Sequence, residues 1–260
     1  MTSEHEQEYD ESLQALLEAV WGEGYLSPGG PDEVAKVVEG VDLKAKTILD
    51  IGCGTGGIDI FLAEKFEPAK IVGIDVDEGL VNRCKTAATG KSLNDVLEFR
   101  AIEPGSLPFD SESFDIVFSK DSIIHIEDKH AIFADIYRVL KPGGVFCASD
   151  WLRNNDEPMS DELSYYVEME DLGFGMASPQ RYDEAMRAAG FVDVTITNRN
   201  EWYRALAKQE HKSLSGELYD GLCKRIGKDF LDHEVEVWRA MTVVLDSDEL
   251  RPSHIRAFKV

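Results

Sequence analysis

Short apolar runs alternate with amphipathic stretches over the first 150 residues of the chain. Runs with the length and composition of buried strands lie at 47–51, 70–75, 97–101, 114–119 and 145–148. Stretches with apolar residues at helical spacing lie at 58–66, 80–88 and 132–140, and the last is stopped by the turn-forming residues 141–144. Such alternation predicts a doubly wound parallel sheet whose ligand crevice lies at the carboxyl ends of the strands.

The pattern changes after Asp150, where helical spacing dominates. Helices are expected at 161–172, 178–190, 202–226 and 234–244, and two further strands at 191–197 and 254–260. The final strand is expected to make its edge of the sheet antiparallel. Before the first strand lie an amphipathic helix at 8–20, a turn-rich loop at 25–30 and a second helix that begins near Val34.

These elements predict an α/β fold: a Rossmann-like doubly wound seven-stranded sheet with a helical lid insertion. We expect a single domain over residues 1–260. Its parts are a core at 31–150, 191–200 and 250–260, an N-terminal cap at 1–30, and a lid at 151–190 and 201–249.

The chain carries a net charge of −23, from 50 acidic and 27 basic residues. This charge repels nucleic acid and anionic lipid, so a small or cationic substrate is favoured, although an acidic surface also suits a saline habitat. The four cysteines lack metal-ligand spacing and are interpreted as reduced thiols: Cys53, Cys84, Cys147 and Cys223. No signal peptide or membrane span is recognisable, so we expect a cytoplasmic protein, a monomer or a weak homodimer, with no metal.

Closely spaced glycines follow the first strand, a junction that leaves backbone N–H groups facing a ligand. Gly52, Gly54 and Gly57 satisfy the dinucleotide fingerprint, so the glycines alone do not separate a nicotinamide cofactor from S-adenosylmethionine. Asp50, and Asp75 at the end of the second strand, favour S-adenosylmethionine. The first can hold the cofactor's ammonium group and the second its ribose hydroxyls.

These motifs, with 114–117 and 140–144, resemble those of the class I S-adenosylmethionine-dependent methyltransferases. The segments 21–30 and 119–126, with Tyr9, resemble the single-domain phosphoethanolamine N-methyltransferases. This resemblance implies a catalytic latch formed by Tyr9 and His125, with Asp121 close to the substrate nitrogen. The implied cofactor-binding residues are Tyr25, Ser27, Asp50, Gly52, Gly54, Gly56, Asp75, Val76, Ile102, Glu103, Lys120 and Asp121.

The chain departs from that family where the family grips the substrate phosphate. Trp151, Leu172, Phe174 and Met241 stand at those positions, and none can neutralise a dianion. An apolar or cationic group, such as a methylated ammonium held by cation–π attraction, suits them better. The expected substrate contacts are Tyr9, Asp121, Trp151, Phe174, Arg239 and Met241. Four arginines stay open as anion ligands: Arg153, Arg187, Arg239 and Arg251.

An amine must lose a proton before it attacks a methyl group, and a histidine, with an ordinary pKa of about 6.5, suits that task. The leading hypothesis is therefore N-methylation of a small amine with His125 as the base. A glycine, sarcosine or dimethylglycine N-methyltransferase, making betaine, is an alternative that needs an arginine for the carboxylate. A non-catalytic S-adenosylmethionine-binding protein and a nicotinamide dehydrogenase are two further possibilities.

Overall fold

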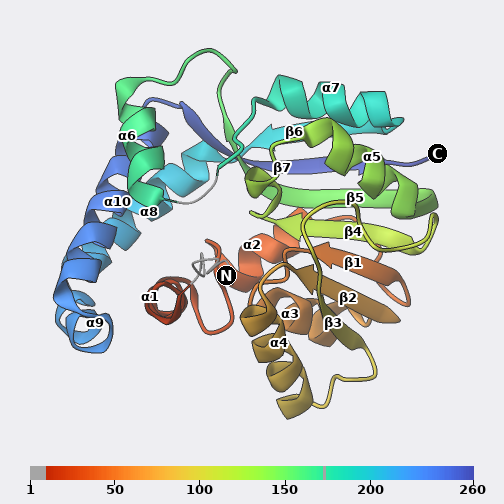
Figure 1. The fold of residues 1–260 in the computed structure, drawn as a ribbon, viewed down its shortest axis with the longest axis horizontal. Coiled ribbons are helices and arrows are strands. Elements are labelled where there is room, and N and C mark those ends of the chain that lie inside the picture. The colour runs from red at the N-terminus through yellow and green to blue at the C-terminus, as the bar shows by residue number, and fades with distance from the viewer. Residues whose placement is uncertain (1–9, 172–173) are drawn as a thin grey trace, which may run out of the picture.

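The computed structural model describes residues 10–171 and 174–260, whose centre is a seven-stranded sheet in the order β3-β2-β1-β4-β5-β7-β6 (Figure 1). The strands are β1 (Thr47–Ile51), β2 (Lys70–Asp75), β3 (Leu97–Ala101), β4 (Phe114–Lys120), β5 (Leu140–Arg153), β6 (Val192–Asn198) and β7 (Leu250–Phe258). Strands β1 to β5 pair in parallel, whereas β7 runs antiparallel to both β5 and β6. The predicted Rossmann-like sheet is confirmed, and the terminal strand pairs into it between β5 and β6, which makes that side of the sheet antiparallel as expected.

Helices cover both faces of this sheet because successive strand residues point to opposite sides. One face is covered by α2 (Gly30–Val37), α3 (Gly57–Phe66) and α4 (Glu78–Gly90). The other is covered by α5 (Lys129–Val139) and α7 (Pro179–Ala189). The sequence pattern assigns the segment that forms α7 to the lid, and this assignment is wrong. Helix α7 packs against α5, because its buried Tyr182, Ala185 and Met186 belong to the core of the sheet.

The remaining helices form a separate group beyond the carboxyl ends of the strands (Figure 1). They are α1 (Glu11–Trp21), α6 (Asp161–Glu170), α8 (Asn200–Leu214), α9 (Tyr219–Ile226) and α10 (Lys228–Asp246). Helix α10 contacts α6, α8 and α9, and α1 packs against α9. The single helix expected at 202–226 is two, since the chain leaves the helix at Ser215 and turns through Gly216. We call α6, α8, α9 and α10 the lid helices.

A buried carboxylate, Glu33 of α2, joins the lid to the sheet. Glu33 is 2% exposed and accepts two hydrogen bonds of 2.9 Å from Arg199, the residue before α8. His254 of β7 lies 2.7 Å from the same carboxylate. Burial alone would raise the pKa of Glu33, but the hydrogen bonds from His254 and Arg199 outweigh it and lower the pKa to about 2. The charged form is therefore favoured in the folded protein.

We predict that Glu33→Gln lowers the free energy of unfolding at pH 7 by about 2–4 kcal/mol, because Arg199 loses its buried partner. The native pKa lies below the ordinary value, so this contribution is present above about pH 4.5 and is lost as the pH falls towards 2. Urea unfolding at pH 7 and pH 3 measures it, with the exposed Glu39→Gln as control. An equal loss at both pH values would contradict the electrostatic explanation.

Candidate functional site

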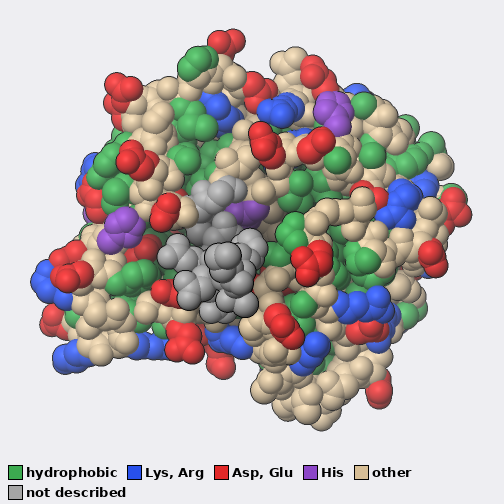
Figure 2. All heavy atoms as spheres, in the orientation of Figure 1, with side chains coloured by type: hydrophobic (Ala, Val, Ile, Leu, Met, Phe, Trp, Pro, Cys, Tyr) green, Lys and Arg blue, Asp and Glu red, His purple; other side chains and the backbone are tan. Residues whose placement is uncertain are grey.

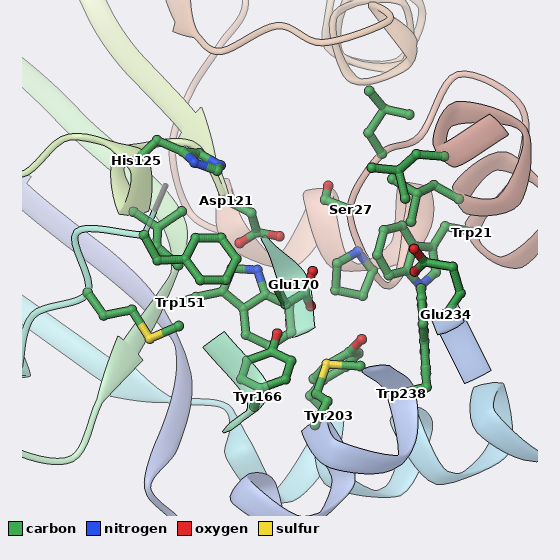
Figure 3. A pocket seen from close by; sticks show the side chains of 18 residues that line it. Trp21, Ser27, Asp121, His125, Trp151, Tyr166, Glu170, Tyr203, Glu234 and Trp238 are labelled. Carbon is green, nitrogen blue, oxygen red and sulfur yellow. The ribbon is translucent and has the colours of Figure 1, made fainter. Parts of the chain in front are cut away.

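A cavity of about 80 Å³ lies between the lid helices, α1 and the carboxyl end of β4. In Figure 2, which has the orientation of Figure 1, acidic side chains are spread over the visible face of the molecule. Figure 3 shows the side chains that line the cavity. Its lining is mostly aromatic and aliphatic: Leu13, Leu17, Trp21, Leu26, Ser27, Pro28, Asp121, Ile124, His125, Trp151, Tyr166, Glu170, Phe174, Met176, Tyr203, Glu234, Trp238 and Met241.

The glycine loop after β1 is shaped by close approaches that a side chain would block. Gly52 has a φ of +78°, and a Cβ there would lie 2.0 Å from the Ser122 hydroxyl oxygen. A Cβ on Gly57 would lie 2.3 Å from the carbonyl oxygen of Gly24, which accepts a 3.1 Å hydrogen bond from the Gly57 N–H. The N-terminal segment is thereby held against the loop. This contact buries Tyr25 and Ser27 next to the crevice.

The acid after β2 braces the same loop. Asp75 accepts hydrogen bonds from the backbone N–H of Gly54 at 2.9 Å and of Asp77 at 3.0 Å. Burial raises the pKa of Asp75, and these backbone hydrogen bonds oppose the rise. The next residue, Val76, is 59% exposed, which is unusual for a large apolar side chain in this protein. Ile102 and Glu103 follow the neighbouring strand β3. This edge therefore offers a carboxylate and an uncovered apolar surface together.

Asp50 lies on β1, two residues before the first glycine of the loop, and is buried. It is 1% exposed beside the fully buried Asp59, and the carboxylate oxygens of both lack a hydrogen-bond donor among the described residues. Burial, and then the charge of Asp59, raise the pKa of Asp50 far above its ordinary value, so the pair holds a proton. The interpretation of Asp50 as a contact for the cofactor's ammonium group stays a prediction.

Asp121 is fixed at the end of β4 by three polar contacts. Its N–H donates to the Ser149 carbonyl at 2.8 Å, and one carboxylate oxygen accepts from the Ser149 hydroxyl at 3.0 Å. The other oxygen pairs with Lys120 at 2.6 Å. The backbone of Asp121 has a φ of +57°, an unfavourable conformation for a residue with a side chain. These contacts offset that cost and point the carboxylate into the cavity.

His125 ends a short 3₁₀ turn, Ile123–His125, that is anchored from behind by a buried lysine. Lys129, 1% exposed, donates to the carbonyls of Ile123, at 2.8 Å, and of Ile126. Burial lowers the pKa of Lys129 to about 8. The turn is thus held in place, with the His125 ring 5.6 Å from that of Phe174.

A second anchor of this turn is Asp150, at 0% exposure on β5. It accepts the Ile124 N–H at 3.2 Å and the Tyr182 hydroxyl at 2.5 Å. Burial raises the pKa of Asp150 to about 7, against the hydrogen bond from Tyr182 and the charge of Lys129. The position of His125 therefore depends on side chains from β5, α5 and α7.

Aromatic rings form the wall opposite, and a buried carboxylate holds them. Glu210 of α8 accepts hydrogen bonds from Trp21 at 2.8 Å, Trp238 at 3.1 Å and Tyr203 at 3.1 Å. Tyr203 packs edge-on against Trp151 with their ring centroids 4.9 Å apart. Since all three donors are neutral, a negative charge on Glu210 has no cation against it, and it makes the wall attractive to cations.

Two more acids reach the cavity from the lid. Glu170 ends α6 and Glu234 lies on α10, and with Asp121 their carboxylates face the middle of the cavity (Figure 3). Burial raises the pKa of Glu170 to about 7, against a hydrogen bond from Tyr166. Burial, then the charges of Glu170 and Asp10, raise the pKa of Glu234 to about 8. Among the described lining residues there is no lysine or arginine.

Many of the site residues expected from the sequence lie in this cavity: Ser27, Asp121, His125, Trp151, Phe174 and Met241. Arg239 does not, and its expected role is corrected: it is exposed and forms an ion pair with Glu236 at 2.6 Å. The other candidate arginines also lie outside the lining, bonded to residues near them in sequence: Arg153, Arg187 and Arg251. Tyr9 and Leu172 lie outside the described residues.

Sequence reasoning missed the two glutamates and much of the aromatic wall. Trp238 has the pattern of a core residue, yet its ring lines the cavity. Glu170 and Glu234 resemble the many acids that face solvent on amphipathic helices. The available signal was position: Glu234 lies three residues before Val237 and four before Trp238, on the apolar stripe of α10.

Comparisons with known proteins agree with this architecture. The sequence profile of the methyltransferase domain matches residues 42–210. Phosphoethanolamine N-methyltransferase 1 of Arabidopsis thaliana is 32% identical over 93% of this chain, which spans 48% of that relative. Phosphoethanolamine N-methyltransferase of Plasmodium falciparum is 29% identical, over 81% of this chain and 78% of its own. The chain thus spans about half the length of the plant enzyme it matches.

Two solved structures share the fold. Haemonchus contortus phosphoethanolamine N-methyltransferase 2, in complex with phosphomonomethylethanolamine and S-adenosylhomocysteine, superposes with a TM-score of 0.86 at 22% identity, over 95% of this chain and 56% of that one. A putative sarcosine dimethylglycine methyltransferase from Galdieria sulphuraria superposes with a TM-score of 0.82 at 20% identity, over 96% and 98% of the two chains. In the described part of the chain, no helix is both long and apolar enough to cross a membrane.

We predict that the stability of Glu234→Gln relative to the parent rises by about 1–3 kcal/mol between pH 5 and pH 8.5. The native pKa of Glu234 lies above its ordinary 4.5, so the parent loses stability as the pH rises from about 4.5 to 8. A glutamine removes that loss. Urea unfolding at several pH values measures it, with Glu236→Gln, on the solvent side of the same helix, as control. A difference that does not change with pH would refute the assignment.

Proposed function

Because this chain belongs to the class I S-adenosylmethionine-dependent methyltransferases, we propose that it transfers a methyl group to the nitrogen of a small amine. The observation that carries the proposal is the placement of Asp121 and His125 in an aromatic cavity beside the glycine loop. A protein that only bound S-adenosylmethionine would need neither a positioned base nor an acceptor cavity.

The crevice beside the glycine loop suits S-adenosylmethionine. In this proposal the carboxylate of Asp75, which braces the glycine loop, accepts the ribose hydroxyls, and the exposed Val76 contacts the adenine ring. Ser27, and Lys120 beside Asp121, are proposed to contact the methionine end. When bound, the cofactor supplies an electrophilic methyl group whose bonding electrons stay with the sulfur.

The acceptor nitrogen is proposed to lie between Asp121 and His125. Asp121 attracts the ammonium form of the amine and orients it, and His125 accepts the proton that must leave before the lone pair is free. Because Lys129 and Asp150 fix the turn that carries His125, little conformational entropy is lost on alignment. The aromatic wall excludes water and accommodates the carbon chain of the substrate.

The cavity favours an amine without an anionic group, which sets this chain apart from its phosphoethanolamine-methylating relatives. A phosphate dianion there would meet Glu170 and Glu234, with no lysine or arginine among the described lining residues. The same absence disfavours glycine, sarcosine and dimethylglycine, since a buried carboxylate needs a cationic partner. Trp151, Phe174 and Met241 instead fit an apolar or methylated ammonium substrate.

We predict that Asp75→Ala weakens binding of S-adenosylhomocysteine by on the order of 10- to 100-fold, because ribose hydroxyls lose a charged acceptor. The loop also loses the bond from Gly54, which adds to the effect. Isothermal titration calorimetry gives the dissociation constant, with the exposed Asp95→Asn as control. An unchanged constant would remove Asp75 from the cofactor site.

We predict methyl transfer to at least one amine in a screen of alkylamines, ethanolamine, dimethylglycine and phosphoethanolamine, with phosphoethanolamine among the poor substrates. His125→Ala should lower kcat on the best amine by about 10²- to 10⁴-fold, while the affinity for S-adenosylhomocysteine hardly changes. The exposed His130→Ala, five residues away, is the matched control. Formation of S-adenosylhomocysteine and product mass are the readouts. Cofactor binding without transfer to any amine would refute the proposal.

A further inference from the structure

We propose, building on the proposed function, that the acceptor is a diamine whose second ammonium group binds between Glu170 and Glu234 at the lid end of the cavity. The two glutamates come from α6 and α10, whereas Asp121 and His125 come from the end of β4 and the turn after it. Acidic side chains thus enter the cavity from the sheet side and from the lid side, which we call its two acidic poles, and Figure 3 shows Asp121, Glu170 and Glu234 around the one cavity.

The strongest evidence for a ligand at the lid end comes from Glu234. It is only 8% exposed, it lines the cavity, and among the described residues it has no hydrogen-bond or ion-pair partner. Within the same ranges, Glu170 receives a hydrogen bond from the neutral Tyr166, and Asp10 adds a third negative charge nearby. A buried carboxylate without a partner costs stability, so the unpartnered Glu234, which lines the cavity together with Glu170, is best explained by a cation that binds there.

The charge balance distinguishes a second ammonium from the acceptor amine itself. Asp121 already has a cation, Lys120, at 2.6 Å, and the acceptor nitrogen must lie at that pole to be reached by His125. A monoamine bound there leaves the lid pair without a counter-ion. A diamine satisfies both poles, and its carbon chain spans the aromatic region of Trp151 and Tyr203 between them.

Three different occupants fit less well. A phosphate or carboxylate is repelled by the lid pair. A metal ion is not supported, since no group of three or more potential ligands is present in the described ranges. An uncharged polar tail would neutralise too little of the negative charge to offset the burial of both glutamates. The second ammonium is therefore the group whose charge matches the site.

The test compares 1,5-diaminopentane with 1-aminopentane, which has the same chain and one charge less. The parent protein should show a kcat/KM for the diamine about 10- to 100-fold above that for the monoamine, the range of one charged hydrogen bond. Glu234→Gln and Glu170→Gln should each lower the ratio of the two kcat/KM values, diamine over monoamine, by at least tenfold. Glu236→Gln, on the solvent side of α10, should change neither value.

Binding measured without turnover separates this inference from the proposed function. Titration of 1,5-diaminopentane into the protein saturated with S-adenosylhomocysteine should give binding that Glu234→Gln weakens by at least tenfold. Such binding supports the second-ammonium site even if no amine is methylated, a result that would overturn only the proposed function. Two results would overturn the inference: equal kcat/KM values for diamine and monoamine, or diamine binding that neither Glu234→Gln nor Glu170→Gln weakens. Neither result would affect the proposed function if a monoamine is methylated.

Discussion

The carboxylate of Glu210 determines whether the aromatic wall exists. It lies on α8 and accepts hydrogen bonds from Trp21 of α1, Trp238 of α10 and Tyr203 of its own helix, so three helices meet at one buried group. Hydrogen bonds to a buried charge are stronger than those between neutral groups, and losing one leaves the charge less solvated. The orientation of each ring is thus coupled to the others. Because these rings hold one another in place, the cavity has a defined shape, although its walls come from segments that lie far apart in the sequence.

Acidic side chains lie on both sides of this wall. Glu210 lies behind it, and Glu170 and Glu234 lie in front, all with pKa values raised by burial. Each such group lowers the stability of the empty fold at neutral pH, whereas the Glu33 network, with its lowered pKa, adds stability where the lid meets the sheet. The Glu33 network therefore stabilises the contact between lid and sheet, whereas the buried acids of the cavity lower the stability of the protein without ligand. Such a combination is typical of a binding site, where contacts with the ligand offset the cost of the buried groups.

The sheet could be predicted from the sequence because its information is local. The strands at 70–75 and 97–101 have the predicted bounds, and Gly52 and Gly54 of the loop after β1 have the positive φ that a tight glycine turn implies. The insertion of β7 between β5 and β6 and the docking of α7 on the sheet are set by contacts between distant segments, which periodicity does not report. The burial of Asp50 beside Asp59 is likewise visible only in the fold, because Asp59 lies on the following helix and helical spacing does not report its neighbours on the sheet.

The division between predictable core and unpredictable lid has a chemical counterpart. The glycine loop, Asp75, Asp121 and His125 are positioned by β1, β2, β4 and the turn after β4, where strand geometry fixes each side chain. Glu170 and Glu234 come instead from α6 and α10, where the sequence pattern does not separate an acid that faces the cavity from one that faces solvent. One inward-facing residue such as Glu234 can therefore reverse the charge preference of the cavity without disturbing the transfer machinery. A methyltransferase profile that matches residues 42–210, and a relative at 32% identity, therefore show the family without deciding the acceptor, because a few cavity side chains are enough to change which ligand a shared fold binds.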